Sequence, residues 1–235
     1  RDTNSLIAID MLDRNTTLNQ NMVVIGTSGV GKTTYMIQKI LRYAIQDYQI
    51  YIIDPENEYT RIVEALGGSV LHLTSNAKYK INPLQIFSEE ILSADEAVTN
   101  LDELVKDKIQ RLKGFFEVLK DDMTQVEKAV MDNIVKNAYI NSGILKYNRL
   151  NEIKNEQWPT LSNVYDELTK LSEKDPEKFK TIKDFYFILG SYTHGSNTLF
   201  DGATNINLDT KIVSFDLKPL QSEQEVQAGA YLNTF

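Results

Sequence analysis

A glycine-rich loop constrains this chain more than any other feature of its sequence. Residues 26–33 read Gly-Thr-Ser-Gly-Val-Gly-Lys-Thr and match the pattern G-x-x-x-x-G-K-[ST]. The segment before it, Met22 to Ile25, is apolar and rich in β-branched residues, which predicts a short buried strand. Residues 33–44 carry apolar side chains near helical spacing, which predicts a helix. A strand, a glycine loop and a helix in this order are the setting in which the pattern binds phosphate.

Each residue type in this loop suits the phosphates of a nucleoside triphosphate. Glycines let successive backbone N–H groups turn inward as an anion nest, and the following helix directs its positive end at the same point. Lys32 is expected to reach the β and γ phosphates and to serve in catalysis, and the Thr33 hydroxyl to bind Mg²⁺. The predicted nucleotide-binding residues are Gly26, Thr27, Ser28, Gly29, Val30, Gly31, Lys32, Thr33 and Thr34. The alternative is a glycine-rich turn with an incidental lysine.

Three acidic residues follow the next predicted strand, which covers residues 50–53. The carboxyl ends of parallel strands line the ligand crevice, so Asp54, Glu56 and Glu58 are expected near the phosphate loop. They could coordinate Mg²⁺ through water or hold the attacking water. They could instead cap the helix predicted over residues 60–66. Both interpretations stay open for Asp54 and Glu56, and catalysis is favoured for Glu58.

Two later segments also have the character of strands. Residues 69–73 include His72, which is expected to be a packed histidine and not a metal ligand. The chain contains two histidines and no cysteine, which disfavours a transition-metal site. Residues 211–216 end in Asp216, which is either an acidic residue on the Mg²⁺ side of the site or the end of an ordinary strand.

Between these strands the pattern is helical from about residue 93 to residue 190. Two capping boxes, Ser93-x-x-Glu96 and Thr124-x-x-Glu127, predict the starts of the first two helices. The second helix is expected to end near Gly143, a third to begin after Pro159, and a fourth to run from Pro176 to Gly190. The simplest interpretation is an inserted helical subdomain whose core contains the aromatic residues Phe115, Phe116, Phe185, Tyr186 and Phe187.

Composition excludes several classes of protein. Hydrophobic residues make up 42% of the chain, enough to bury a core. The net charge of −8 supplies no global electrostatic reason to bind nucleic acid. The absence of cysteine excludes a disulfide scaffold and a thiol nucleophile. No uninterrupted apolar run approaches the roughly 18 residues of a membrane span.

Several segments together resemble one known family. They read GTSGVGKTT, IIDPENEY and INPL, then, after the helical block, LFDG-x-TN and VSFDLKPL. This series resembles the type IV secretion and conjugative-transfer assembly ATPases, the VirB-four class in the DNA-pump branch of the P-loop ATPases. The phosphate loop is shared by many ATPases, whereas the DPENEY and LFDG…FDLKPL segments are more specific. The resemblance extends from about Ile7 to Phe235.

The resemblance implies an α/β fold: a RecA-like P-loop core with an inserted all-helical subdomain. Residues 1–90 would form the first part of the core, 91–190 the inserted subdomain, and 191–235 the return to the core. It implies ATP and Mg²⁺ as cofactors and Glu58 as the family's acid after the second strand. It also implies a ring, taken to be a hexamer, at the inner face of the cell membrane. There the protein would be cytoplasmic and held through other secretion-machine subunits, with DNA as a further partner.

One departure leaves the function open. The family carries a second acidic motif and an arginine that acts across subunits, and neither is found by Phe235. We therefore expect part of a longer polypeptide. The first hypothesis is a motor that hydrolyses ATP to assemble a secretion machine or move its substrate. The second is a DNA translocase, and the third is a nucleotide-binding scaffold without turnover.

Overall fold

A small parallel sheet organises the part of the chain that positions the phosphate loop. The computed structural model describes residues 19–76, 78–87, 100–206 and 210–234. Within these ranges the sheet contains strands β1 (Ile50–Asp54), β2 (Ser69–His72) and β3 (Ile212–Asp216). All pairings are parallel and the order is β1-β3-β2, so the last strand in sequence lies in the middle.

The register brings three polar residues to one level at the carboxyl ends of the strands. Asp54 of β1 pairs with Asp216 of β3, and Asp216 also pairs with His72 of β2. Neighbouring parallel strands lie about 4.8 Å apart, so these side chains begin close together. The carboxyl edge of a parallel sheet is where α/β proteins bind ligands, which makes this level the place to look for a site.

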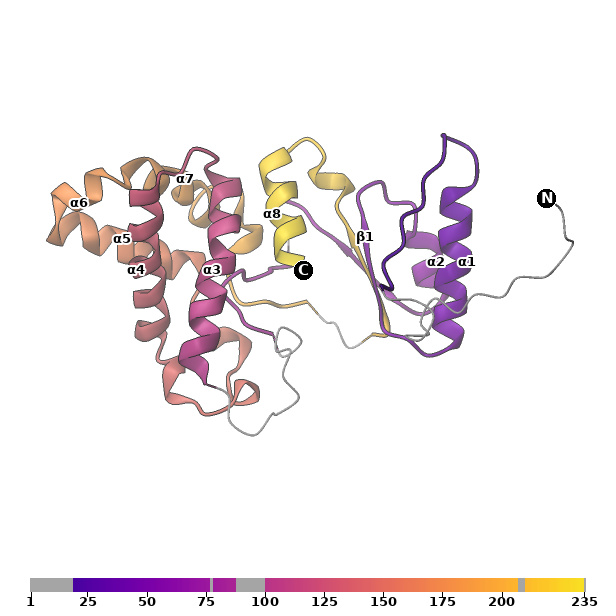
Figure 1. The fold of residues 1–235 in the computed structure, drawn as a ribbon, viewed down its shortest axis with the longest axis horizontal. Helices are drawn as coiled ribbons and strands as arrows, with labels where there is room; N and C mark the ends of the chain where they lie inside the picture. Colours follow the sequence, from indigo (N-terminus) through magenta and orange to yellow (C-terminus); the bar gives the residue numbers. More distant parts are fainter. Residues whose placement is uncertain (1–18, 77, 88–99, 207–209, 235) are drawn as a thin grey trace, which may run out of the picture.

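Helices cover both faces of the sheet. Helices α1 (Lys32–Ile45) and α2 (Thr60–Ala65) lie on one side of the strands, and α8 (Gln224–Thr234) lies on the other (Figure 1). On the α1 and α2 side, Ile40, Ile52, Val63 and Ile212 form a small apolar cluster. Val213 and Phe215 belong to the larger cluster beyond the opposite face, as the two-residue period of a strand requires. Burial on both faces explains why all five residues of β3 are apolar or buried polar.

The larger body of helices lies between β2 and β3 in sequence and to one side of the sheet in space (Figure 1). Its helices are α3 (Leu101–Leu119), α4 (Gln125–Ser142), α5 (Leu161–Lys174), α6 (Pro176–Lys180) and α7 (Lys183–Thr193). Short 3-10 turns occupy Ile144–Lys146, Leu150–Glu152, Asn155–Gln157, Thr198–Phe200 and Lys218–Leu220. The division of the chain into core and inserted subdomain at residues 90 and 190 stays a prediction.

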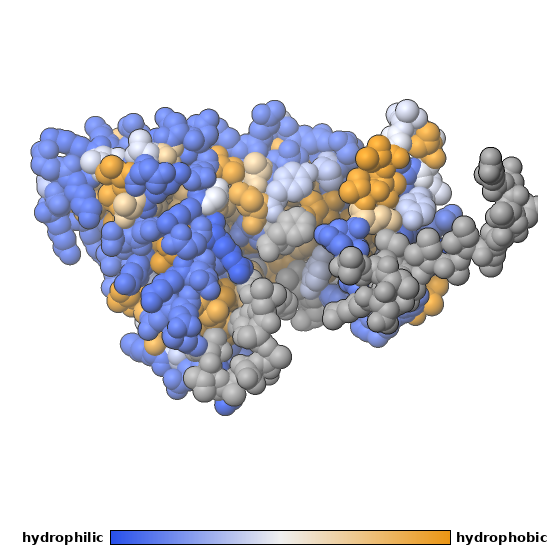
Figure 2. Space-filling view, viewed as in Figure 1, coloured by the Kyte–Doolittle hydropathy of each residue, from blue (hydrophilic) through white to orange (hydrophobic). Residues whose placement is uncertain are grey.

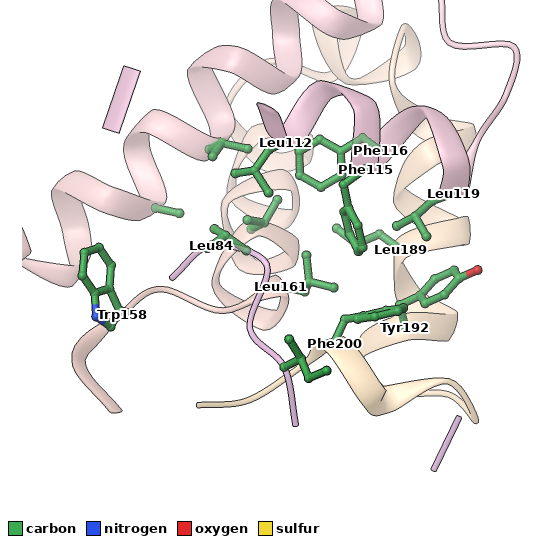
Figure 3. Packing of buried hydrophobic residues seen from close by; sticks show 14 of the residues in the cluster. Leu84, Leu112, Phe115, Phe116, Leu119, Trp158, Leu161, Leu189, Tyr192 and Phe200 are labelled. Atoms are coloured by element: carbon green, nitrogen blue, oxygen red, sulfur yellow. The ribbon is translucent and has the colours of Figure 1, made fainter. Parts of the chain in front are cut away.

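Aromatic rings join these helices into one core. Phe115 and Phe116 of α3 pack edge to face against Phe200 and Phe185, with ring centroids 5.2 and 5.5 Å apart (Figure 3). Helix α8 approaches this cluster closely, because a Cβ atom on Gly229 would lie 3.1 Å from the Phe200 ring. A larger residue at position 229 would therefore push α8, which follows the last strand, away from the helical body.

Local sequence signals set the helix boundaries as predicted at several points. In the capping box before α4, the Glu127 amide donates to the Thr124 hydroxyl and the Thr124 amide donates to the Glu127 carboxylate. The same helix ends at Gly143, whose φ of 75° favours glycine. The Asp201 carboxylate of the LFDG segment accepts hydrogen bonds from the Ser162 amide and hydroxyl at the start of α5. The Ser93-x-x-Glu96 box lies outside the described residues.

Three sequence predictions about helices, strands and the aromatic core are wrong. Residues 22–25 form no strand, and Val23 and Ile25 are 80% and 89% exposed, because no described strand lies beside them to share hydrogen bonds and cover them. Figure 2 shows apolar side chains at the surface over the upper end of α1 and the segment before it. The predicted helix from residue 176 to 190 is two helices, with a break between Lys180 and Lys183. Phe187 is exposed and lies outside the core that contains its neighbour Phe185.

The capping box predicts how stability depends on pH. Burial by itself would raise the pKa of Glu127, but hydrogen bonds from Thr124 and Lys120 outweigh burial and lower that pKa below its ordinary value of 4.5. The native state therefore binds fewer protons, so the stabilisation is complete above about pH 4.5 and is lost as the pH falls. We expect Glu127→Gln to lower the free energy of unfolding at pH 7 and to flatten its decrease in acid.

Chemical denaturation between pH 3 and pH 7 measures this effect. Glu177→Gln is the matched control, because Glu177 pairs with Lys180 at the surface and its side chain is 81% exposed. Exposed ion pairs contribute about 0–1 kcal/mol, so the control should follow the wild-type profile. Equal acid profiles for Glu127→Gln and the wild type would contradict the role given to the capping box.

Candidate nucleotide-binding site

The backbone of residues 26–31 has the shape that its glycines permit. Gly29 and Gly31 have φ angles of 80° and 92°, in the left-handed region that costs other residues about 1–3 kcal/mol. A Cβ atom on Gly26 would lie 2.7 Å from the Val30 Cγ2 atom, so the loop closes on itself at this point. Residues 26–31 are exposed, and the loop therefore presents its backbone to solvent.

Lys32 holds the two ends of the loop together. Its ammonium donates hydrogen bonds to the carbonyl oxygens of Gly26 and Thr27, at 2.8 and 3.0 Å. The side chain therefore folds back over the loop that it follows in sequence. An ammonium in this position is next to the space that a phosphate would occupy above the loop amides, as the motif predicts.

The amino end of α1 adds a favourable dipole to the same place. Gly31 is the N-cap residue, no side chain caps the helix, and its first turn contains no acidic residue. The first backward bond of the helix runs from the Tyr35 amide to the Gly31 carbonyl. The amides of Lys32, Thr33 and Thr34 therefore have no helical partner and remain suited to an anion.

The segment after β1 is a turn built on Asp54. Asp54 is 1% exposed, and its two carboxylate oxygens accept hydrogen bonds from the Glu58 and Tyr59 amides at 2.9 and 2.8 Å. Both oxygens are thus engaged by amides that precede the first residue of α2, and no side chain caps that helix. Asp54 shapes the turn before α2 and does not cap the helix itself. Glu56 is exposed. Burial first, and then the carboxylates of Glu58 and Asp54, raise the pKa of the Tyr59 hydroxyl.

Glu58 joins this turn to the phosphate loop. Its Oε2 atom accepts a hydrogen bond from the Thr33 hydroxyl at 2.9 Å, although the two residues are 25 positions apart. The predicted Mg²⁺ ligand and the predicted catalytic acid are therefore in direct contact. The hydroxyl and carboxylate oxygens are ligands that Mg²⁺ prefers, and the Lys32 ammonium and the uncapped amino end of α1 suit the phosphates that would accompany it.

Asp216 occupies the centre of the carboxyl edge of the sheet. It is 1% exposed, and its Oδ2 atom accepts a hydrogen bond from the Asn57 amide group at 2.9 Å and contacts His72 Nδ1 at 2.6 Å. Its Oδ1 atom accepts from the Lys218 amide at 3.0 Å. The prediction that His72 is packed in the core is wrong, because its side chain is 54% exposed and its polar contact is this carboxylate.

The structure brings the predicted residues Thr33 and Glu58 together, and it adds Asn57, which the sequence analysis did not single out. Asn57 has a φ of 57°, and asparagine tolerates this left-handed conformation better than most residues do. An asparagine one position before a candidate catalytic acid, in a turn after a strand, is the signal that could have found it. The pairing of His72 with Asp216 left no such signal, because it depends on the strand order β1-β3-β2.

The glycine loop, the uncapped end of α1 and the parallel sheet define a P-loop nucleotide-binding domain. Comparison with known proteins gives the particular family. The chain belongs to the TraG P-loop domain family, whose model matches residues 3–228. The fold is similar to the solved structure of VirB4 of Thermoanaerobacter pseudethanolicus, with a TM-score of 0.82 and 27% sequence identity. The resemblance to type IV secretion and conjugation ATPases is thereby confirmed.

This chain corresponds to only part of the VirB4 chain. The structural match covers 98% of this chain but 59% of the VirB4 chain. A search of curated proteins finds no match. Among the residues that the structure describes, no helix is both long and apolar enough to cross a membrane.

The loop geometry predicts a position-specific effect on nucleotide binding. Gly31→Ala places a Cβ atom in open space but strains the backbone at a φ of 92°. The strain raises the free energy of the loop conformation that would bind the phosphates. We expect Mg·ATP to bind on the order of tenfold more weakly, measured by fluorescence titration.

Gly67→Ala is the matched control. Gly67 has a φ of 74° and equally open space around its Cβ position, but it follows α2 and lies outside the phosphate loop. It should lower stability and leave Mg·ATP binding unchanged. Equal affinity for Gly31→Ala and Gly67→Ala would show that the loop shape is not what binds the nucleotide.

Proposed function

We propose that this chain binds Mg·ATP in the loop of residues 26–34 and supports its hydrolysis as the motor domain of a type IV secretion or conjugation system. The observation that carries the proposal is the hydrogen bond between Thr33 and Glu58. It joins the phosphate loop to an acidic residue in the turn after β1, where a carboxylate could act on a water molecule beside the phosphates. Membership of the TraG P-loop domain family supports the same activity.

Each residue of the site has a distinct proposed role. The backbone amides from Gly26 to Thr34 and the Lys32 ammonium bind the phosphates and offset the charge that develops on them. Thr33 would hold Mg²⁺, which neutralises phosphate charge when it is bound. The Thr33 hydroxyl donates a hydrogen bond to Oε2 of Glu58. The Glu58 carboxylate would orient a water molecule beside the terminal phosphate.

The wider setting is proposed from the family. We propose a RecA-like core in which helices α3 to α7 form the inserted subdomain, within residues 91–190. We also propose that copies of the protein form a ring, a hexamer, on the cytoplasmic side of the membrane. In this arrangement it would dock on other secretion-machine subunits, and its motion would drive assembly or substrate transfer. DNA is a partner only if it stimulates turnover.

Substitution of Lys32 and Glu58 tests the proposal. ATP turnover with Mg²⁺ is measured on the full encoded polypeptide, together with ATP affinity. Lys32→Ala should weaken binding and lower turnover on the order of 100-fold, because a charge aimed at the phosphates is lost. Glu58→Gln should keep binding and lower turnover by about 100-fold or more, because an amide is a poor base.

Matched controls separate these roles from general charge effects. Lys39→Ala removes a lysine from the same helix, and Glu64→Gln neutralises an exposed acid of α2, the helix that follows the turn. Both should resemble the wild type. ATP binding that depends on Lys32, without any turnover in the wild type, would contradict the motor and favour a nucleotide-binding scaffold.

A further inference from the structure

We propose that Asn57, Asp216 and His72 are positioning residues that hold Glu58 against the phosphate loop. This inference rests on the proposed function, because it assigns a task to residues around the proposed catalytic acid. None of the three belongs to the phosphate-loop motif, and two of them come from strands other than β1, the strand that precedes Glu58.

Asn57 is held on both sides of its amide group. Its nitrogen donates a hydrogen bond to Asp216 at 2.9 Å, and its oxygen accepts one from the Thr60 hydroxyl at 2.5 Å. Its backbone has a φ of 57°, which is uncommon for a residue other than glycine. A strained conformation persists where its surroundings determine it, and here the two side-chain bonds do so. Glu58 is the next residue, so its direction follows from that of Asn57.

Asp216 is the fixed point of this arrangement. It ends the central strand, is 1% exposed and engages both carboxylate oxygens. A buried carboxylate without partners is costly, so the groups that satisfy it are held firmly in return. His72 shares the Oδ2 atom with Asn57, at 2.6 Å from the other side. His72 is largely exposed, so this contact is not a consequence of core packing.

Two hydrogen bonds to backbone carbonyl oxygens hold the turn after β1 against the segment after β3. The Leu217 amide donates to the Asp54 carbonyl at 3.0 Å, and the Gln221 side chain donates to the Pro55 carbonyl at 3.0 Å. Both contacts lie before Asn57 in the turn. Asp54 accepts hydrogen bonds from the Glu58 and Tyr59 amides and so holds the backbone on both sides of Glu58. Asn57 ties the residue before Glu58 to the central strand through Asp216.

Glu58 needs such support because its own side chain is exposed. A free glutamate side chain loses rotamer entropy when it is ordered. A misplacement of about 1 Å in a catalytic group can cost about 100-fold in rate. A rigid turn under Glu58 should therefore raise the rate of hydrolysis. It should not change the affinity for Mg·ATP, because the phosphates are bound by the separate loop of residues 26–34.

Asn57→Gly tests this inference without straining the backbone. Glycine accepts the φ of 57° and removes only the amide bonds to Asp216 and Thr60. We expect kcat for ATP to fall about 10- to 100-fold while the Kd of Mg·ATP stays within about twofold of the wild-type value. Asp47→Gly is the matched control. Asp47 is also a non-glycine residue with a positive φ, 65°, but it follows the carboxyl end of α1 and lies outside the turn that contains Glu58.

A double variant shows whether Asn57 acts through Glu58. If it does, adding Asn57→Gly to Glu58→Gln lowers kcat no further, because the group that it positions is already disabled. A merely structural role predicts a lower melting temperature and the same additional loss of kcat in both backgrounds.

His72 offers a conservative variant for rescue. His72→Asn keeps a donor that can reach Asp216 and should retain most of kcat, whereas His72→Leu should lower it with little change in Kd. Equal kcat values for His72→Asn and His72→Leu would remove His72 from the set.

The outcomes separate the inference from the proposed function. Lys32→Ala in the same assay reports on the function itself. If the wild type shows no turnover that depends on Lys32, both the proposed function and this inference fail. If that turnover is present and Asn57→Gly leaves kcat unchanged, the inference alone is overturned.

Discussion

The position of β3 is the constraint on which the rest of the structure depends. This strand lies between β1 and β2, yet β2 ends at His72 and β3 begins only at Ile212. The sheet therefore closes only after the chain has passed through the helical body and returned. Joining such distant segments costs loop-closure entropy, which is recovered by burying every residue of β3 between two layers of helices. The same return brings α8 onto α3, so the sheet and the helical body share one core.

Two buried carboxylates at the edge of the sheet have different roles in forming the site. Asp54 binds backbone amides and so shapes the turn that contains Glu58. Asp216 binds side chains from two other segments and so ties that turn to the central strand. Glu58, between them, reaches Thr33 of the phosphate loop. Each carboxylate is satisfied by several donors, which is the condition under which a charged group can be buried in a fold of marginal stability.

Much of the site could be predicted because its signals are local. The phosphate loop depends on glycines within six residues of one another, and α1 begins within one residue of its predicted start. The capping box at Thr124 and the glycine at position 143 set the ends of α4 by contacts between near neighbours. Local predictions failed where a partner was needed. Residues 22–25 have the composition of a strand, but no described strand pairs with them. Phe187 has the composition of a core residue but is exposed.

The sequence by itself determined the phosphate loop, the helix that follows it and the presence of acidic residues after the second predicted strand. These features depend on backbone conformations and caps that a few adjacent residues specify. Only the tertiary structure decided that Glu58 contacts Thr33, that Asp54 binds the amides of its turn, and that His72 leaves the core to pair with Asp216. The contact between Glu58 and Thr33 joins two segments 25 positions apart. The contact between His72 and Asp216 follows from strand order and register, which depend on the packing of segments more than a hundred residues apart and leave no trace in local spacing.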